Sequence, residues 1–259
     1  MSILVDETAM TDTTKFELAL VMPVYNEEAC INEVVSSWLR ELSGLDINFV
    51  MILLNDGSQD QTEDKLTYFA SNSRIKIINK KNSGHGPTIL LGYHQAVYLA
   101  EWVFQTDSDD EMKPGYFKEL WNNRQDKDAL FGFRKGWKQS ASRSFISYVS
   151  RVTVGILFGT GVTDVNTPYR LVRAKLLMDI IGSIPDDTYA PNIIISGELS
   201  VIGARIYNHP VPHEGRKTGS CSIVKWNLLK AGYKSFFQTI CYRYVVNRLK
   251  LFERYGDQD

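Results

Sequence analysis

The sequence has few cysteines, no long apolar run and almost no net charge, and each shortage excludes a class of protein. Its three cysteines are far apart and lack metal-ligand spacing, which argues against a disulfide framework and against a zinc site. No segment reaches the roughly 18 to 20 consecutive apolar residues of a membrane-spanning helix. The 29 basic and 30 acidic residues nearly cancel, so nucleic acid is not an expected partner. We therefore expect a cytoplasmic protein whose membrane contact, if any, is peripheral.

The composition suits one large α/β domain. The chain has 259 residues, of which 44% are hydrophobic and 23% charged, enough for a well-buried core. Residues 1–15 are polar and acidic and lack the apolar stretch of a secretory signal, so we expect a flexible tail there. We expect the domain over residues 16–222. Residues 223–259 are rich in aromatic and basic residues and predict an amphipathic helical tail.

Short apolar runs alternate with helical patterns along the first half of the chain. The predicted strands are 18–22, 49–54, 75–78, 102–105 and 129–133, and the predicted helices are 29–42, 60–70, 87–100 and 114–123. This alternation is typical of parallel strands joined by crossover helices, so it predicts a mostly parallel central sheet. Further helices are expected over about 145–158 and 190–203.

Polar segments follow three of the predicted strands directly. They are residues 23–27, 55–58 and 106–110. Ligands of open α/β sheets bind outside the carboxyl ends of the strands, so these segments predict one site. Asp107 and Asp109 are the strongest signal, because two carboxylates at a strand end can share Mg²⁺ or Mn²⁺ with a diphosphate. The alternative is an acidic loop that only caps the helix starting near Pro114.

Two further segments have a functional and an ordinary interpretation. Asp56 in the 55–58 turn can accept hydrogen bonds from a base or ribose, although such a tetrapeptide is also a common turn. Residues 82–86 place glycines and free backbone N–H groups before a helix, where a phosphate or sugar can bind. His85 within this segment is interpreted as an ordinary loop histidine.

In order and spacing, these segments resemble the family 2 glycosyltransferases, particularly the dolichol-phosphate-mannose-synthase-like branch. The resemblance covers residues 18 to about 222 and includes two later blocks, 162–171 and 210–220. It implies a single GT-A (Rossmann-like) domain with a C-terminal helical tail. Within that domain it implies a nucleotide-sugar-binding half over residues 16–126 and an acceptor half over residues 127–222.

The resemblance also implies roles for individual residues. The residues expected around the nucleotide-diphospho-sugar are Pro23, Tyr25, Glu27, Asp56, Gly84, Gly86 and Asp107. The expected ligands of Mg²⁺ or Mn²⁺ are Asp109 as the main one, with Asp107 and Glu111. The expected catalytic contacts, which include cationic contacts to the acceptor, are Asp109, Arg134, Asp164 and Arg216.

Two departures from the family pattern leave the donor base and the acceptor open. Asn55 stands where the family usually has an aspartate, so GDP- and UDP-sugars are both candidate donors. A sugar hydroxyl needs a general base, for which Glu198 and Asp187 are the candidates. A polyprenyl phosphate needs none, because its phosphate oxygen is already anionic.

The interpretation we prefer is inverting, metal-dependent transfer to a polyprenyl phosphate at the cytoplasmic membrane face. The tail is then a candidate for contact with anionic lipid, and its alternative is packing against protein. Two other functions stay open. One is transfer to a glycan hydroxyl in polysaccharide or O-antigen synthesis, and the other is non-catalytic binding of a nucleotide-sugar.

Overall fold

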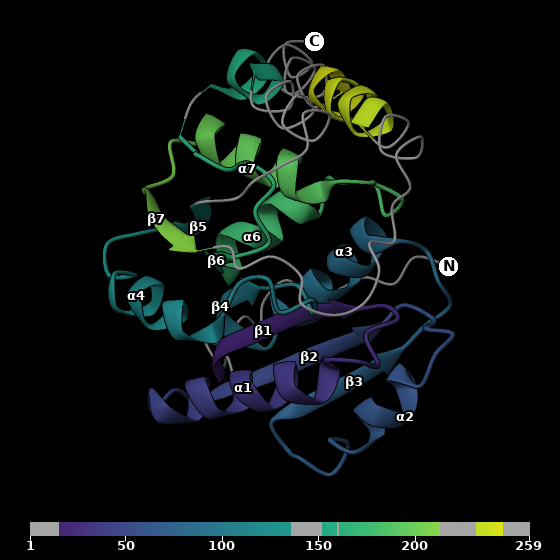
Figure 1. Cartoon of the computed structure of the whole chain (residues 1–259). Helices are drawn as coiled ribbons and strands as arrows, with labels where there is room; N and C mark the ends of the chain where they lie inside the picture. The colour runs from purple at the N-terminus through teal and green to yellow at the C-terminus, as the bar shows by residue number, and fades with distance from the viewer. Residues whose placement is uncertain (1–15, 136–151, 160, 213–231, 246–259) are drawn as a thin grey trace, which may run out of the picture.

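The computed structural model describes residues 16–135, 152–159, 161–212 and 232–245 (Figure 1). Within these ranges one seven-stranded sheet has the order β3-β2-β1-β4-β6-β5-β7. The strands are β1 (Phe16–Val24), β2 (Phe49–Asn55), β3 (Ile75–Asn79), β4 (Ala100–Gln105), β5 (Ala129–Lys135), β6 (Arg170–Arg173) and β7 (Ile206–Pro212).

The sheet is mostly parallel, as predicted. The pairs β1–β2, β2–β3 and β1–β4 are parallel, and so is β5–β7. Only β6 runs antiparallel to both of its neighbours, β4 and β5. The five predicted strands are confirmed, with β4 starting two residues earlier than expected. Neither β6 nor β7 was predicted.

Helices cover both faces of this sheet. They are α1 (Ile31–Gly44), α2 (Thr62–Thr67), α3 (His85–Ala96), the 3₁₀ turn η1 (Pro114–Tyr116), α4 (Phe117–Asn122), α6 (Ala174–Ile181) and α7 (Pro191–Val201). Residues 152–158 and 232–245 are also helical. No helix in the described ranges is long and apolar enough to cross a membrane.

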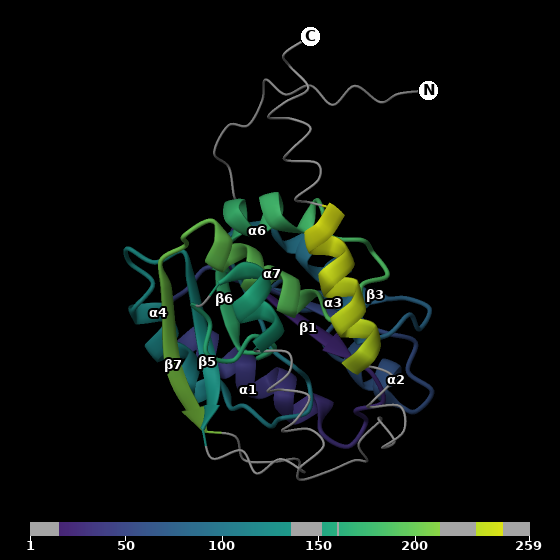
Figure 2. The ribbon, with the colours of Figure 1, turned by 90° about the horizontal axis from the view of Figure 1, so that it is seen from above.

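The central strand β1 shows why both faces are covered. Its successive side chains point to opposite faces. Leu18, Leu20 and Met22 pack with apolar residues of α1 and α4, whereas Ala19 and Val21 pack with α3, α6 and α7. The helices therefore form a layer on either side of the sheet, as Figures 1 and 2 show.

Helix α3 differs from its predicted range of 87–100. It begins at His85, because Gly84 precedes it with a φ of +96°, a backbone conformation that glycine adopts without steric cost. It ends at Ala96, and Ala100 is already the first residue of β4. The helix therefore begins directly after the polar segment 82–84, two residues earlier than predicted.

The helix over residues 232–245 presents several aromatic side chains outward. Ser235, Thr239 and Tyr242 are buried against the domain, while Tyr233 and Phe237 are 70% and 56% exposed. The exposed side also carries Phe236, Tyr244 and Val245. The predicted helical tail is confirmed over these residues, and its remaining part lies outside the described ranges. Of the helix predicted over about 145–158, residues 152–158 are described and helical.

Candidate active site

A small pocket lies at the carboxyl end of β4. Its lining residues are Thr106, Asp107, Asp109, Glu111, Met112, Arg134 and Pro168. The structure thus brings together four of the side chains predicted from the sequence, Asp107, Asp109, Glu111 and Arg134. The three carboxylates follow β4, whereas Arg134 is on β5, and β6 lies between these two strands.

The acidic loop after β4 turns sharply, so its carboxylates point in different directions. The backbone N–H of Glu111 donates to Asp109 Oδ1 at 3.2 Å, which closes the loop. Asp110 has a φ of +60°, and its carboxylate forms an ion pair with Lys113. Asp107 and Asp109 line the pocket and Asp110 does not.

The donor set of this pocket fits a hard divalent cation that is shared with a substrate. Carboxylate oxygens are the ligands that Mg²⁺ and Mn²⁺ prefer. No group of three or more His, Cys, Asp or Glu side chains in the described ranges is arranged to hold a metal by itself. Asp107, Asp109 and Glu111 all line one pocket, and their predicted role as ligands of one cation stays a prediction. Mg²⁺ commonly binds through one or two carboxylates plus substrate phosphates, which this pocket allows.

Arg134 is held at the rim of the pocket by Asp164. Its Nε donates to Asp164 Oδ2 at 2.7 Å and its Nη2 donates to Oδ1 at 3.0 Å. The two side chains are 15% and 19% exposed, so the pair is largely shielded from water. A bidentate pair fixes the plane of the guanidinium. Asp164 therefore acts on the pocket through Arg134.

Asp56 holds the loop that leads into α3. Its carboxylate accepts from the backbone N–H of Ser83 at 2.9 Å and of Gly84 at 3.0 Å, and it pairs with Lys80. The residue is 3% exposed. The adjacent Gly57 has a φ of +67°, and a Cβ there would lie 2.8 Å from the backbone nitrogen of Asn82. The predicted contact of Asp56 with the donor stays a prediction.

Gly84 and Gly86 lack side chains for two different reasons. Gly84 adopts a positive φ with open space around its Cβ position. At Gly86 a Cβ would lie 2.2 Å from the carbonyl oxygen of Thr188 and 2.3 Å from that of Tyr189. Close packing of α3 against the segment before α7 thus explains why residue 86 has no side chain. The predicted contacts of Gly84 and Gly86 with the donor stay predictions.

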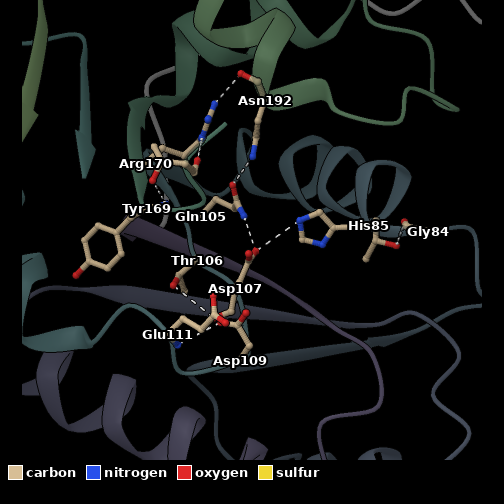
Figure 3. Close-up of polar contacts among 12 residues, drawn as sticks. Gly84, His85, Gln105, Thr106, Asp107, Asp109, Glu111, Tyr169, Arg170 and Asn192 are labelled. Atoms are coloured by element: carbon tan, nitrogen blue, oxygen red, sulfur yellow. Dashed lines mark hydrogen bonds and ion pairs between the residues drawn. The ribbon is translucent and has the colours of Figure 1, made fainter. Parts of the chain in front are cut away.

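A buried polar network stands behind Asp107 (Figure 3). Gln105 Nε2 donates to Asp107 Oδ1 at 3.1 Å, and Asn192 Nδ2 donates to Gln105 Oε1 at 2.8 Å. The Tyr93 hydroxyl lies 3.1 Å from Asn192 Oδ1 and 3.3 Å from Gln105 Oε1. Neither Gln105 nor Asn192 was predicted from the sequence. A polar residue at the end of an apolar strand, two residues before the acidic motif, is the signal that identifies Gln105.

Arg170 supports this network through the backbone of Asn192. It is 1% exposed, and its guanidinium donates to the backbone carbonyls of Val165, Thr167 and Asn192 at 2.9 to 3.2 Å. Burial lowers the pKa of Arg170, and the nearby Tyr93, Asp164 and Asp107 act in the opposite direction. An arginine stays charged under such conditions, so the buried network next to the site carries a fixed positive charge.

His85 contributes a side chain that the sequence analysis had set aside. It is the first residue of α3, and its Nε2 lies 3.6 Å from Asp107 Oδ1 (Figure 3). The imidazole is 57% exposed. It thus lies between solvent and the acidic loop.

Other predicted donor residues lie at the carboxyl end of β1. Pro23 is part of that strand and buried, whereas Tyr25 follows it and is partly exposed. Glu27 is 8% exposed, and its backbone N–H donates to Thr62 Oγ1 at 2.8 Å. Their contacts with a donor stay predictions. Arg216 lies outside the described residues.

Glu198 is not among the residues that line the pocket, and its assignment as a candidate base stays a prediction. It is 5% exposed and accepts from Arg243 Nη1 at 3.4 Å, on the side of α7 that faces the helix over 232–245. The cause is helical geometry: Asn192 and Glu198 are six residues apart on α7, so they point to different sides. Asn192 faces the site and Glu198 faces the tail.

The family described as Glycosyl transferase family 2 matches residues 19–180. An uncharacterized glycosyltransferase of Synechocystis sp. is 29% identical over 83% of this chain and 65% of its own length. The undecaprenyl-phosphate 4-deoxy-4-formamido-L-arabinose transferase of Proteus mirabilis is 23% identical over 83% of this chain and 64% of its own length. The chain thus spans just under two thirds of the length of these two relatives.

Among solved structures, the fold is similar to that of glucosyl-3-phosphoglycerate synthase from Mycobacterium tuberculosis. Its complex with Mn²⁺, UDP and glucosyl-3-phosphoglycerate has a TM-score of 0.62 at 17% identity, over 88% of this chain and 80% of that chain. A second complex, with Mn²⁺, UDP-glucose and phosphoglyceric acid, has a TM-score of 0.64 at 14% identity, with the same coverage. These likenesses show the fold and confirm the predicted GT-A class.

Proposed function

This chain belongs to glycosyltransferase family 2, and from that membership we propose that it transfers a sugar, with inversion, from a nucleotide-diphospho-sugar to a polyprenyl phosphate. The observation that carries the proposal is the pocket lined by Asp107, Asp109, Glu111 and Arg134. It combines carboxylates suited to a divalent cation with a fixed guanidinium suited to an anion.

Asp109, with Asp107 and Glu111, would hold Mn²⁺ or Mg²⁺ in this pocket. When bound, the cation neutralises the diphosphate charge that develops as the leaving group departs. Asp107 would also orient the donor, and the start of α3 would offer backbone N–H groups to a phosphate. The structurally similar synthase was crystallised with Mn²⁺ and UDP, which supports testing that metal and UDP-sugars first.

Arg134 would orient the acceptor phosphate. Its guanidinium is fixed by Asp164 and lines the same pocket as Asp109. A phosphate oxygen is anionic near neutral pH, so its attack needs orientation rather than removal of a proton. The placement of Glu198 away from the pocket agrees with this mechanism, as does the likeness to undecaprenyl-phosphate transferases.

The outward aromatic face of residues 232–245 would contact the lipid surface that holds such an acceptor. Three exposed aromatic residues, Tyr233, Phe237 and Tyr244, share one side of the helix, with the exposed Lys234 beside them. Polar groups attach the other side: Gln238 Oε1 accepts from the Tyr189 N–H at 2.9 Å. Aromatic and basic side chains of this kind suit the boundary between lipid headgroups and acyl chains.

Transfer to a glycan hydroxyl is the second candidate, and one observation favours it. The carbonyls of Thr188 and Tyr189 pack on Gly86 at the start of α3, so the preceding Asp187 belongs to a segment beside the donor loop. Asp187 is exposed and would serve as the base.

Nucleoside diphosphate release tests these functions. The purified protein is incubated with Mn²⁺ and a panel of GDP- and UDP-sugars, with and without a polyprenyl phosphate. Release that requires the lipid phosphate and is lost in Asp109→Ala supports the proposal. Release that needs a glycan and is lost in Asp187→Asn supports the second candidate. Donor binding without turnover across both acceptor classes contradicts both and favours a non-catalytic binding protein.

A further inference from the structure

Gln105 is a polar side chain in a place where polarity is costly. It is the last residue of β4 and 0% exposed, in a strand whose neighbouring positions are apolar. A buried amide without hydrogen bonds costs roughly 1 to 3 kcal/mol. Hydrogen bonds offset this cost at both ends of the amide. The partner of its nitrogen is Asp107, and the partners of its oxygen are Asn192 and Tyr93.

These partners specify which way the amide of Gln105 points. Asn192 Nδ2 can only donate, and it lies 2.8 Å from Gln105 Oε1. The carboxylate of Asp107 can only accept, and its Oδ1 lies 3.1 Å from Gln105 Nε2. Reversing the amide would set oxygen against oxygen at Asp107 and nitrogen against nitrogen at Asn192. One orientation is therefore strongly favoured.

Asn192 is itself fixed by two groups. The Tyr93 hydroxyl donates to Asn192 Oδ1 at 3.1 Å, and Asn192 Nδ2 donates to Gln105 Oε1 at 2.8 Å. Arg170 Nη1 donates to the backbone carbonyl of Asn192 at 3.1 Å and so anchors the first turn of α7. The orientation is consequently transmitted from Arg170 and Tyr93 to Gln105 and then to Asp107.

We propose that Gln105 is a positioning residue for Asp107 and that Asn192 and Tyr93 fix the orientation of its amide. This inference rests on the proposed function, in which Asp107 orients the donor. The amide N–H restrains rotation of the Asp107 carboxylate and offsets part of the negative charge of the acidic loop. An anionic diphosphate then meets a carboxylate that is already oriented and partly neutralised.

Four variants separate this role from ordinary packing. Gln105→Leu removes the donor to Asp107, and Asn192→Asp replaces the donor that orients Gln105 with an acceptor. Tyr93→Phe removes only a hydroxyl. Ser196→Ala is the matched control, because Ser196 is also buried on α7 but bonds to Val165 and Arg170 rather than to Gln105.

The measurement is calorimetric binding of UDP and GDP in the presence of Mn²⁺, together with the KM for the sugar donor. We expect Gln105→Leu and Asn192→Asp to weaken nucleotide binding by about 10- to 100-fold, the range for a hydrogen bond to a charged group. The donor KM rises by a similar factor, while the acceptor KM stays unchanged. Tyr93→Phe has a smaller effect in the same direction, and Ser196→Ala stays within about twofold of wild type.

A double-mutant cycle shows whether Gln105 acts through Asp107. In an Asp107→Ala background, which removes the acceptor of the Gln105 amide, Gln105→Leu should weaken binding by no more than about twofold further, because two residues that act through the same contact are not additive. Full additivity overturns the inference, and so does wild-type binding by Gln105→Leu. Thermal unfolding checks that each variant folds. If Gln105→Leu does not fold, Asn192→Asp and Tyr93→Phe decide by the same criteria.

The two proposals fail in different ways. Wild-type protein that binds no nucleoside diphosphate with Mn²⁺ contradicts the proposed function, and the inference falls with it. Wild-type protein that binds the nucleotide, with Gln105→Leu and Asn192→Asp equal to it, contradicts the inference alone.

Discussion

Arg134 and Asp164 form a bidentate ion pair, with N···O distances of 2.7 and 3.0 Å, at the rim of the pocket that contains Asp109. Arg134 is on β5 and Asp164 lies in the segment before β6. Asp164, which precedes β6, therefore holds the guanidinium of Arg134 on the neighbouring strand β5 in place.

Weakening this pair should lower turnover more than stability. Asp164→Asn keeps one acceptor but loses the charge that orients Arg134, and Arg134→Lys loses the bidentate fork. We expect each to lower kcat/KM for the acceptor by about 10- to 100-fold, as for other hydrogen-bonded charge pairs at least partly shielded from water. Steady-state kinetics with varied acceptor measure this. Asp128→Asn, which breaks an ion pair remote from the pocket, is the control and should leave kcat/KM unchanged.

Asp109 and Asp110 should differ sharply although they are adjacent. Asp109→Asn removes a proposed metal ligand and should weaken Mn²⁺-dependent nucleotide binding by about 100-fold or more, since a catalytic metal contributes several kcal/mol. Asp110→Asn only breaks the pair with Lys113 and tolerates the positive φ at this position. Calorimetric titration with and without Mn²⁺ compares the two. Equal losses in both variants would mean that the loop's net charge matters and no specific ligand exists.

Gly86→Ala should damage the protein, and Gly44→Ala should not. A methyl group at Gly86 meets two backbone carbonyls at 2.2 and 2.3 Å, so α3 or the segment before α7 must shift. Overpacking of this kind costs about 1 to 3 kcal/mol or more. Gly44 ends α1 with nothing within 4 Å, where alanine stabilises by about 0.4 to 1 kcal/mol. Urea unfolding of both variants gives the difference, and an undamaged Gly86→Ala protein would contradict the close packing.

The stability of the domain should fall in acid partly because of Asp128. Arg205 donates hydrogen bonds to its carboxylate and, as the largest cause, lowers the pKa of Asp128 to about 2. A carboxyl group with a lowered folded-state pKa stabilises the fold above its unfolded pKa of about 3.9, and this contribution disappears as the pH falls through about 2. Asp128→Asn should therefore be less stable than wild type at pH 7, by about 0.5 to 1 kcal/mol for a pair with an exposed arginine. Urea midpoints at pH 7, 4 and 2 should show this gap closing in acid, and a gap independent of pH would exclude the charge as its cause.

Vesicle binding should depend on the outward aromatic side of residues 232–245. Tyr233→Ser combined with Phe237→Ser removes two apolar side chains, each contributing roughly 1.5 to 3 kcal/mol when fully buried in lipid. We expect at least a tenfold loss of co-sedimentation with vesicles that contain anionic lipid. Tyr68→Ser is the control, because Tyr68 is 86% exposed but follows α2, on the opposite side of the sheet. Unchanged co-sedimentation of the double variant would assign this surface to a protein partner.

The sheet and the acidic pocket follow from local patterns in the sequence. Alternating apolar runs identify β1 to β5, and an acidic motif directly after β4 identifies Asp107 and Asp109, because both signals lie within a few consecutive residues. Strand β6 could not be found in this way. It has only four residues and begins with Arg170, whose burial depends on carbonyls of Val165, Thr167 and Asn192.

The roles of single residues depended on contacts between distant segments. Glu198 is suitable by type and position on a predicted helix, but the side of α7 that it occupies faces Arg243. Gly86 fits a phosphate-binding loop by pattern, and its actual neighbour is the backbone 102 residues further along the chain at Thr188. Residue type and spacing cannot distinguish these cases, because they do not say which elements meet.

The placement of β6 between β4 and β5 also sets an order of events during synthesis. The parallel group β1 to β4 is complete once residue 105 has left the ribosome, whereas the partners of β5 in the described part of the chain are β6 and β7. Residues 129–135 are therefore synthesised well before either of their partner strands. Until β6 docks, β4 and β5 both expose an edge that can pair with another nascent chain. Pairing of β6, which begins with Arg170, covers both of these edges, and we expect it to be the step that ends their availability to other nascent chains.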